Sequence, residues 1–218
     1  MMPVLTVDQI SKCYRIPDPK TGHRRDFWAL REVSFSLEPG EALGLQGANG
    51  SGKSTLLKII SEIVRPTSGT VRVQGTLAPL LDLGAGFHPE LTGQENLYVY
   101  GSLIGLRRKQ LRAHFDEIVA FAGIEDFLGT KVRHYSQGMQ MRLAFSIAST
   151  LRPGLLLADE ILAVGDVEFQ QQALQRLLYL KEQGTAIVLV QHDPALIDRV
   201  CDRTLRLEAG VEMPASGK

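Results

Sequence analysis

The sequence predicts an α/β fold in which an all-helical segment interrupts a core of alternating strands and helices. Three observations predict it. A short strand at 41–46 runs into a glycine-rich loop and a helix, while residues 92–151 show helical patterns without a convincing strand. Continuous apolar runs then return at 155–158 and 186–190, as is typical of parallel strands covered on both faces. The 218 residues suffice for one such domain.

The elements before the insertion follow from local patterns. Alternating or mixed apolar and polar residues predict strands at 4–7 and 29–37, joined by a Pro- and Gly-rich hairpin loop at 17–22. These strands would form an N-terminal antiparallel β subdomain. Apolar residues at helical spacing predict a helix over 53–63, and strands follow at 70–73 and 77–81.

The later elements are mostly helical. The expected helices are 94–104, 108–122, 137–151, 168–183 and 194–201. We therefore expect one domain over 1–218. Residues 1–91 and 152–218 would form its α/β core and β subdomain, and residues 92–151 its helical subdomain.

Composition excludes several classes of protein. Lys plus Arg and Asp plus Glu balance at 24 each, so the overall charge does not indicate a nucleic-acid partner. No apolar run approaches the ~18 residues that span a bilayer, and the N-terminus lacks a signal-peptide pattern. Cys13 and Cys201 have no metal-ligand spacing, so we expect thiols in a reducing compartment.

A phosphate-binding motif lies between the strand at 41–46 and the helix that follows. Residues 47–54 fit the pattern GxxxxGK[ST], in which glycines let backbone N–H groups curl around phosphate oxygens. Lys53 supplies a positive charge for the β- and γ-phosphates, and the Ser54 hydroxyl can bind Mg²⁺. The residues expected to contact the nucleotide here are Gly47, Asn49, Gly50, Ser51, Gly52, Lys53, Ser54 and Thr55.

Two acidic residues, Asp159 and Glu160, follow the apolar strand at 155–158. The carboxyl end of a parallel strand faces the crevice where ligands bind in open α/β sheets. Asp159 is placed to hold Mg²⁺, directly or through water, and Glu160 to orient and deprotonate the attacking water. Acids often follow strands, so this pair indicates ATP hydrolysis only in combination with the phosphate loop.

A third motif reads Tyr-Ser-Gln-Gly-Met-Gln and begins at Tyr135. Its serine is a good helix N-cap, and its glycine allows close backbone approach. The segment resembles the Leu-Ser-Gly-Gly-Gln signature of ABC ATPases and lies, as in that family, between the phosphate loop and the acidic pair. Ser136, Gly138 and Gln140 match the signature, whereas Gln137 and Met139 depart from it.

The resemblance to ABC ATPases implies a RecA-like P-loop NTPase core and further site residues. His192 would be the switch histidine that contacts the γ-phosphate, and Asp166 would lie in the loop that crosses a dimer interface. Tyr14 resembles the aromatic residue that stacks on adenine, although Trp28 could compete after a long loop. The family's usual glutamine before the helical insertion is missing, and Asp82 is the nearest polar candidate for this Mg²⁺ contact.

Within the family, the chain is most similar to ATPase subunits that export O-antigen, teichoic acid or capsular polysaccharide. Segments 83–96, 135–139 and 159–166 carry this similarity. It implies export of lipid-linked polysaccharide by an ATP-bound homodimer attached to an integral membrane permease on the cytoplasmic face of the inner membrane. Phe87 would anchor that permease. O-antigen exporters often carry an extra C-terminal carbohydrate-binding domain, for which this sequence has no room before Lys218. We therefore expect a chain that either lacks this module or has been cut short.

Three alternatives stay open at this point. The chain could serve a drug or lipid exporter, because an ATP site does not contact the cargo. A soluble ABC ATPase acting on DNA or ribosomes usually has two cassettes, coiled coils or basic arms, which a single neutral cassette lacks. A P-loop nucleotide kinase would need an arginine-rich lid and would have no use for the segment at Ser136.

Overall fold

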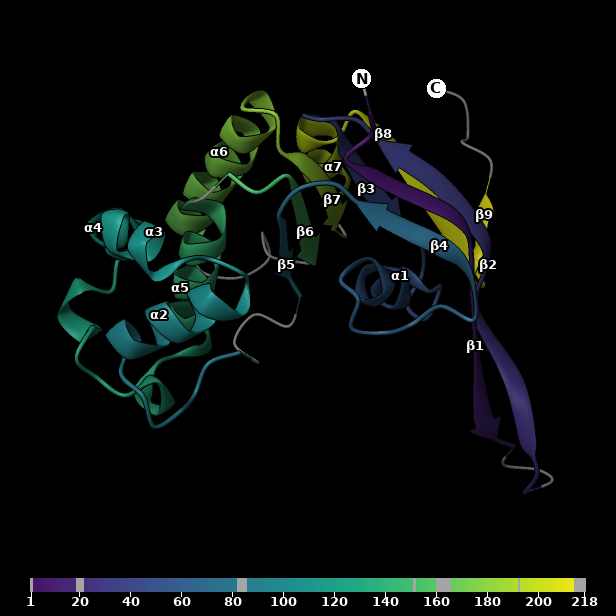
Figure 1. Ribbon diagram of the computed structural model, residues 1–218, viewed down its shortest axis with the longest axis horizontal. Coiled ribbons are helices and arrows are strands. Elements are labelled where there is room, and N and C mark those ends of the chain that lie inside the picture. The colour runs from purple at the N-terminus through teal and green to yellow at the C-terminus, as the bar shows by residue number, and fades with distance from the viewer. Residues whose placement is uncertain are drawn as a thin grey trace.

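The computed structural model describes residues 2–18, 22–81, 86–150, 152–159, 166–191 and 193–213. It confirms the α/β class. The described strands form a sheet with the order β4-β1-β2-β9-β8-β3-β7-β6-β5, and α2 to α5 gather in an arm at one side of it (Figure 1). Within the described residues, no helix combines the length and apolar character needed to cross a membrane.

The parallel part of the sheet forms the centre of the molecule. It consists of β5 (Leu77–Leu80), β6 (Leu155–Asp159), β7 (Ala186–Val190), β3 (Ala42–Gln46) and β8 (Arg203–Glu208). Successive side chains of a strand point to opposite faces, so each apolar strand contributes to two cores. The flanking helices are α1 (Lys53–Ile60), α6 (Val167–Glu182) and α7 (Pro194–Val200).

β6 illustrates this two-sided burial. Leu155 and Leu157 pack in the same cluster as the α1 side chains, whereas Leu156 and Ala158 pack with residues of α6 such as Phe169. The strand is therefore held on both faces, and its carboxyl end at Asp159 is fixed beside the start of α1.

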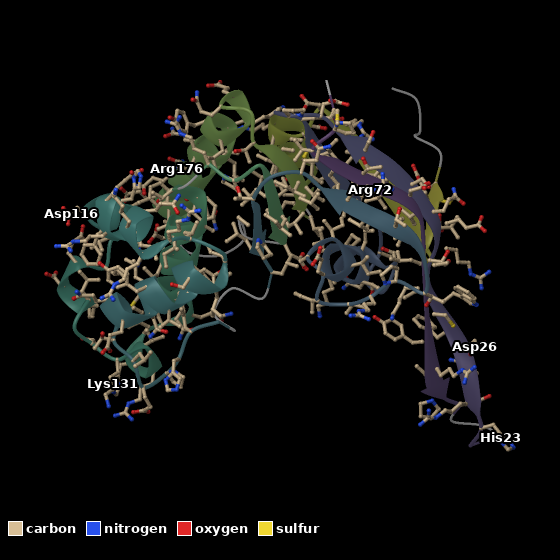
Figure 2. All side chains as sticks on the ribbon, viewed as in Figure 1. His23, Asp26, Arg72, Asp116, Lys131 and Arg176 are labelled. Carbon is tan, nitrogen blue, oxygen red and sulfur yellow. The ribbon has the colours of Figure 1, made fainter. Side chains whose placement is uncertain are left out.

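The antiparallel part is longer than the sequence pattern predicts. β1 (Leu5–Pro17) pairs with β2 (Arg24–Leu37), and β4 (Ser68–Val73) supports β1 only from Leu5 to Ser11. Beyond that point the hairpin continues as two strands, out to His23 near its tip (Figure 2). The expectation of a long loop before Trp28 was wrong. The far part of β2 is exposed on both faces, so it lacks the apolar alternation that marks a half-buried strand.

Two C-terminal strands are absent from the sequence prediction. β8 pairs with β3, and the short β9 (Val211–Met213) joins β8 to β2 through the Arg31–Val211 pair. Together they connect the parallel core to the hairpin. β9 has three residues, all exposed, which leaves too little pattern to predict from.

The helical arm consists of α2 (Gly93–Leu103), α3 (Arg108–Ala113), α4 (Phe115–Ala122) and α5 (Gln137–Thr150), with short 3₁₀ turns at Glu125–Phe127 and Val132–His134. Thr92 begins α2 with a full capping box, in which its hydroxyl and the Glu95 carboxylate each accept a backbone N–H of the other. The single helix expected at 108–122 is two helices. His114, with φ −110° and ψ 13°, leaves helical geometry between them.

Phe87 belongs to the interior of this arm. Its side chain is 9% exposed, and its ring lies 5.1 Å from that of Tyr100 in the arm's apolar cluster. Burial also raises the pKa of Tyr100 to about 12. The expectation that Phe87 anchors a membrane subunit was therefore wrong, because a ring that fills the arm's own core offers little surface to a partner.

α5 joins the arm to the sheet. Leu143 and Ile147 lie in the arm's cluster, whereas Phe145 lies in the cluster shared with β6 and α6. Phe145 packs edge-on against Phe169 of α6 at 5.9 Å, and both contact Phe121 of α4. Three helices therefore meet in one aromatic cluster.

Candidate nucleotide-binding site

The loop between β3 and α1 is shaped by glycines that no other residue can replace. Gly47 has a φ of 146°, and a Cβ atom there would collide with the carbonyl oxygen of Leu207. Gly52 has a φ of 109°, and its Cβ atom would lie 2.5 Å from the carbonyl oxygen of Ala29. The loop thus packs directly on the backbone of its neighbours. Gly52 caps α1 without a side chain, so the helix N-terminus is left to bind an anion.

Lys53 closes over this loop. Its side chain is largely buried, and its Nζ atom donates hydrogen bonds to the carbonyl oxygens of Gly47 at 2.8 Å and Ala48 at 3.0 Å. The backbone thereby holds the ammonium group above the curled main chain. A positive charge, the N-terminal dipole of α1 and a concave loop converge at one point, as a phosphate group requires.

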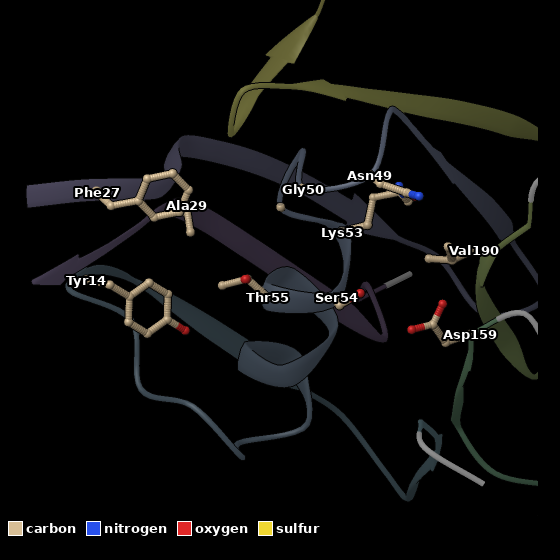
Figure 3. A pocket seen from close by; sticks show the side chains of 11 residues that line it. Tyr14, Phe27, Ala29, Asn49, Gly50, Lys53, Ser54, Thr55, Asp159 and Val190 are labelled. Carbon is tan, nitrogen blue, oxygen red and sulfur yellow. The ribbon is translucent and has the colours of Figure 1, made fainter. Parts of the chain in front are cut away.

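A cleft of about 410 Å³ opens in front of the loop. Its lining residues are Tyr14, Phe27, Ala29, Asn49, Gly50, Gly52, Lys53, Ser54, Thr55, Asp159 and Val190. Figure 3 shows Tyr14 and Phe27 at one end, Asp159 near Ser54 and Val190 at the other, and the loop residues between. Eight of the predicted site residues thus line one cleft: Tyr14, Asn49, Gly50, Gly52, Lys53, Ser54, Thr55 and Asp159. Ser51 is buried and, with Asn49 and Gly50, lines a smaller hollow beside β8.

The acidic end of the cleft suits a magnesium ion. The Ser54 hydroxyl and the Asp159 carboxylate both line it, and hard oxygen donors are the ligands that Mg²⁺ prefers. Mg²⁺ is usually held by one or two protein oxygens together with substrate phosphates. The residues present therefore fit the ion, with the phosphate groups completing its shell.

Two aromatic rings, those of Tyr14 and Phe27, form one end of the cleft. Tyr14 and Phe27 are directly paired in the β1–β2 register, and both line the cleft. Trp28 instead lines a separate hollow on the sheet, where the guanidinium of Arg31 lies 5.6 Å from its ring. Phe27 is a site residue that the sequence analysis missed. Phe27 shares the face of Ala29 along β2, but residues 24–28 are exposed on both faces, so no apolar alternation marked it in the sequence.

The signature segment lies at the start of α5, and its residues do not line this cleft. The hydroxyl of Ser136 accepts the backbone N–H of Met139 at 3.2 Å, so the serine caps α5 as the sequence suggested. Ser136 itself is exposed, and Gly138 and Gln140 are partly exposed. Asp166 caps α6 in the same way by accepting the N–H of Phe169 at 2.8 Å. Both helix starts therefore present polar groups to the surface.

Three predicted residues, Glu160, His192 and Asp82, lie outside the described part of the chain. For two of them, the adjacent described residues can be placed. Asp159 ends β6, and Gln191 directly follows β7, which pairs with β6 up to Val190. Asp159 and Gln191 therefore lie at the carboxyl edge of the sheet, where the cleft is.

At this edge a phosphate-binding loop leads into α1, and the carboxylate of Asp159 lies beside it. This arrangement is that of a P-loop nucleotide-binding protein. Residues 30–163 match the family model described as ABC transporter, and the chain belongs to this family.

The chain is similar to ATP-binding proteins of O-antigen and teichoic acid export. It is 46% identical to the O-antigen export system ATP-binding protein RfbB of Myxococcus xanthus, over 84% of this chain and 42% of that protein. The RfbB of Klebsiella pneumoniae is 42% identical, over 84% and 75%. The teichoic acids export ATP-binding protein TagH of Lactiplantibacillus plantarum is 44% identical, over 84% and 50%. The chain thus spans between about two fifths and three quarters of these relatives.

Solved structures share the fold. An ATP-binding subunit of an ABC transporter superposes with a TM-score of 0.83 at 26% identity, covering 97% of this chain and 88% of that one. A dimeric post-hydrolysis state of the cassette MJ0796, bound to ADP and Pi, gives a TM-score of 0.81 at 24% identity, over 98% and 100%.

Proposed function

We propose that this chain is the ATPase subunit of an ABC transporter and hydrolyses ATP with Mg²⁺. The observation that supports the proposal is the order of side chains along the cleft, with aromatic rings first, then the phosphate loop, then Ser54 and Asp159. Mg²⁺-ATP would present its base, phosphates and metal in the same order. Lys53, the loop amides and the N-terminus of α1 would bind the β- and γ-phosphates.

The remaining catalytic roles follow from the family motifs. Ser54 and Asp159 would hold Mg²⁺, which neutralises charge that develops on the phosphate oxygens. Glu160 would orient and deprotonate the attacking water, and His192 would contact the γ-phosphate. Asp82 is kept as a further candidate contact to the ion.

We propose further that the active form is an ATP-bound homodimer with shared sites. Ser136, Gly138, Gln140 and Asp166 are motif residues, yet none lines the cleft of its own chain. In the proposed dimer, the signature of one subunit caps the γ-phosphate in the cleft of the other, and Asp166 lies at the interface. The α5 N-terminus would add its positive dipole end to that phosphate.

The proposed cargo is lipid-linked polysaccharide, exported through an integral membrane permease to which this chain binds on the cytoplasmic face of the inner membrane. This proposal is supported by the similarity to O-antigen and teichoic acid export proteins. The ATP site gives no support of its own, because it does not contact the cargo.

The cellular test replaces the gene with one that encodes Lys53→Ala. The expected result is a bare cell surface with lipid-linked polymer inside the cell, and the wild-type gene should restore the surface glycan. Normal glycan together with new drug sensitivity would assign the chain to a drug exporter instead.

A further inference from the structure

Arg142 of α5 lies against the start of α6. Its Nη1 atom is 3.6 Å from Oδ2 of Asp166, and its guanidinium lies 5.9 Å from the ring of Phe169. Its side chain is 27% exposed. Among the described residues, no atom accepts a hydrogen bond from the Nε atom of Arg142. The ion pair with Asp166 is the polar contact of this guanidinium within that part of the chain.

The partner of Arg142 is itself a helix cap. Asp166 uses Oδ1 to accept the N–H of Phe169 and Oδ2 to face Arg142. Arg142 therefore contacts both residues that define the first turn of α6, and it belongs to the same helix that Ser136 begins. One side chain thus ties the N-terminal half of the signature helix to the residue that caps α6.

We infer that Arg142 is a positioning residue that holds Ser136 and Asp166 in fixed relative positions. The inference rests on the proposed dimer, in which these two residues act together on the same partner subunit. Packing of Phe121, Phe145 and Phe169 brings the helices together, but the hydrophobic effect that drives this packing is not directional. The Arg142 pair adds the direction, because the planar guanidinium must both cover Phe169 and face the Asp166 carboxylate.

The chain supplies a matched control in Arg176. This residue lies at the same junction of arm and core (Figure 2). Its Nη1 atom pairs with Oε1 of Glu117 at 3.0 Å, and its guanidinium lies 4.6 Å from the ring of Phe121. It thus repeats the ion pair and the ring contact between α6 and α4, without touching Ser136 or Asp166. Replacing it removes the same chemistry from a place that the inference does not involve.

The test compares Arg142→Met, Arg142→Lys and Arg176→Met in the full chain. A shift of about 1 Å in a catalytic arrangement can cost up to roughly 100-fold in rate, so Arg142→Met should lower kcat roughly 10- to 100-fold. It should also weaken ATP-dependent dimers in sedimentation, while ATP binding to the monomer stays at the wild-type Kd. Arg142→Lys should recover part of the loss, because it keeps the charge but not the planar fork. Arg176→Met should keep the wild-type kcat.

A second measurement works without turnover. In the nucleotide-free monomer, hydrogen exchange of the Phe169 amide should speed up in Arg142→Met and not in Arg176→Met, because the Asp166 cap loses its support. Wild-type kcat and wild-type exchange in Arg142→Met would overturn the inference, as would equal losses in both Met variants. If the wild-type chain neither hydrolyses ATP nor dimerises with it, the proposed function fails, and the exchange experiment still decides the role of Arg142.

Discussion

Tyr14 and Phe27 face each other across the β1–β2 hairpin and together form the end of the cleft opposite Asp159. One ring comes from β1 and the other from β2, so the pairing of these two strands brings them together at the end of the site proposed for the base. Its phosphate end is made by the loop before α1. The two ends of the site thus depend on different parts of the fold.

Removing either ring should weaken nucleotide binding. Stacking of a base on an aromatic side chain contributes about 1–3 kcal/mol, so Tyr14→Ala and Phe27→Ala should each raise the Kd for ATP accordingly. Isothermal titration calorimetry measures the change. Trp28→Ala is the control, because its ring lines the other hollow and should leave the Kd unchanged. An equal loss in Trp28→Ala would show that the assignment of rings is wrong.

Hydrolysis should depend on Lys53 and Glu160 in different ways. Lys53→Ala removes the positive charge above the loop and should lose ATP affinity or turnover. Glu160→Gln keeps the shape but removes the base, so it should bind ATP while turnover falls by ~10²–10⁴. A coupled phosphate-release assay and a binding titration separate these effects. Wild-type turnover in purified Glu160→Gln protein would refute the role of this residue.

ATP hydrolysis should require Mg²⁺ bound at the acidic end of the cleft. Chelation with EDTA should stop hydrolysis, and added Mg²⁺ should restore it. Ser54→Ala removes one oxygen ligand from the lining, and Asp159→Asn removes the negative charge from another. Each change should raise the Mg²⁺ concentration needed for half-maximal rate. Titration of the rate with Mg²⁺ is the measurement. An unchanged half-maximal concentration in both variants would place the ion elsewhere.

The shared site should be visible when variants are mixed. Ser136→Arg blocks the signature and Lys53→Ala blocks the phosphate loop, so each chain alone should be inactive. A mixture can rebuild one intact site per dimer, from the good loop of one chain and the good signature of the other. Its rate should therefore exceed the sum of the separate rates. Normal hydrolysis by monomeric Ser136→Arg protein would contradict the dimer.

Phe87 should matter for stability. Its ring is buried against Tyr100, and Phe→Ala changes in a core typically cost about 3–5 kcal/mol of unfolding free energy. Urea unfolding followed by circular dichroism measures the loss. Leu103→Ala is the matched control, since Leu103 is 68% exposed and should change stability little. If Phe87→Ala unfolds like the wild-type protein, the ring does not hold the arm together.

The sequence predicts the parallel core best, because continuous apolar runs and the glycine spacing of the loop are local signals. Lys53, Ser54 and Asp159 follow from motifs of this kind, and the structure gathers them in one cleft. Phe27 and Phe87 show where local reasoning fails. Both faces of the hairpin are exposed near Phe27, so no apolar alternation identifies this residue. The burial of Phe87 depends on the ring of Tyr100, which comes from a different element of the chain.

The hairpin has a consequence for which nucleotides the protein accepts. Tyr14 and Phe27 lie beyond Ser11, where β4 no longer supports the hairpin, and a two-stranded ribbon alone is only marginally stable in water. The wall beside the base is therefore held mainly by the pairing of β1 with β2, whereas Gly47 and Gly52 fix the phosphate loop directly on neighbouring backbone. Such a site should be selective for the triphosphate and much less selective for the base. GTP should therefore serve as a substrate nearly as well as ATP.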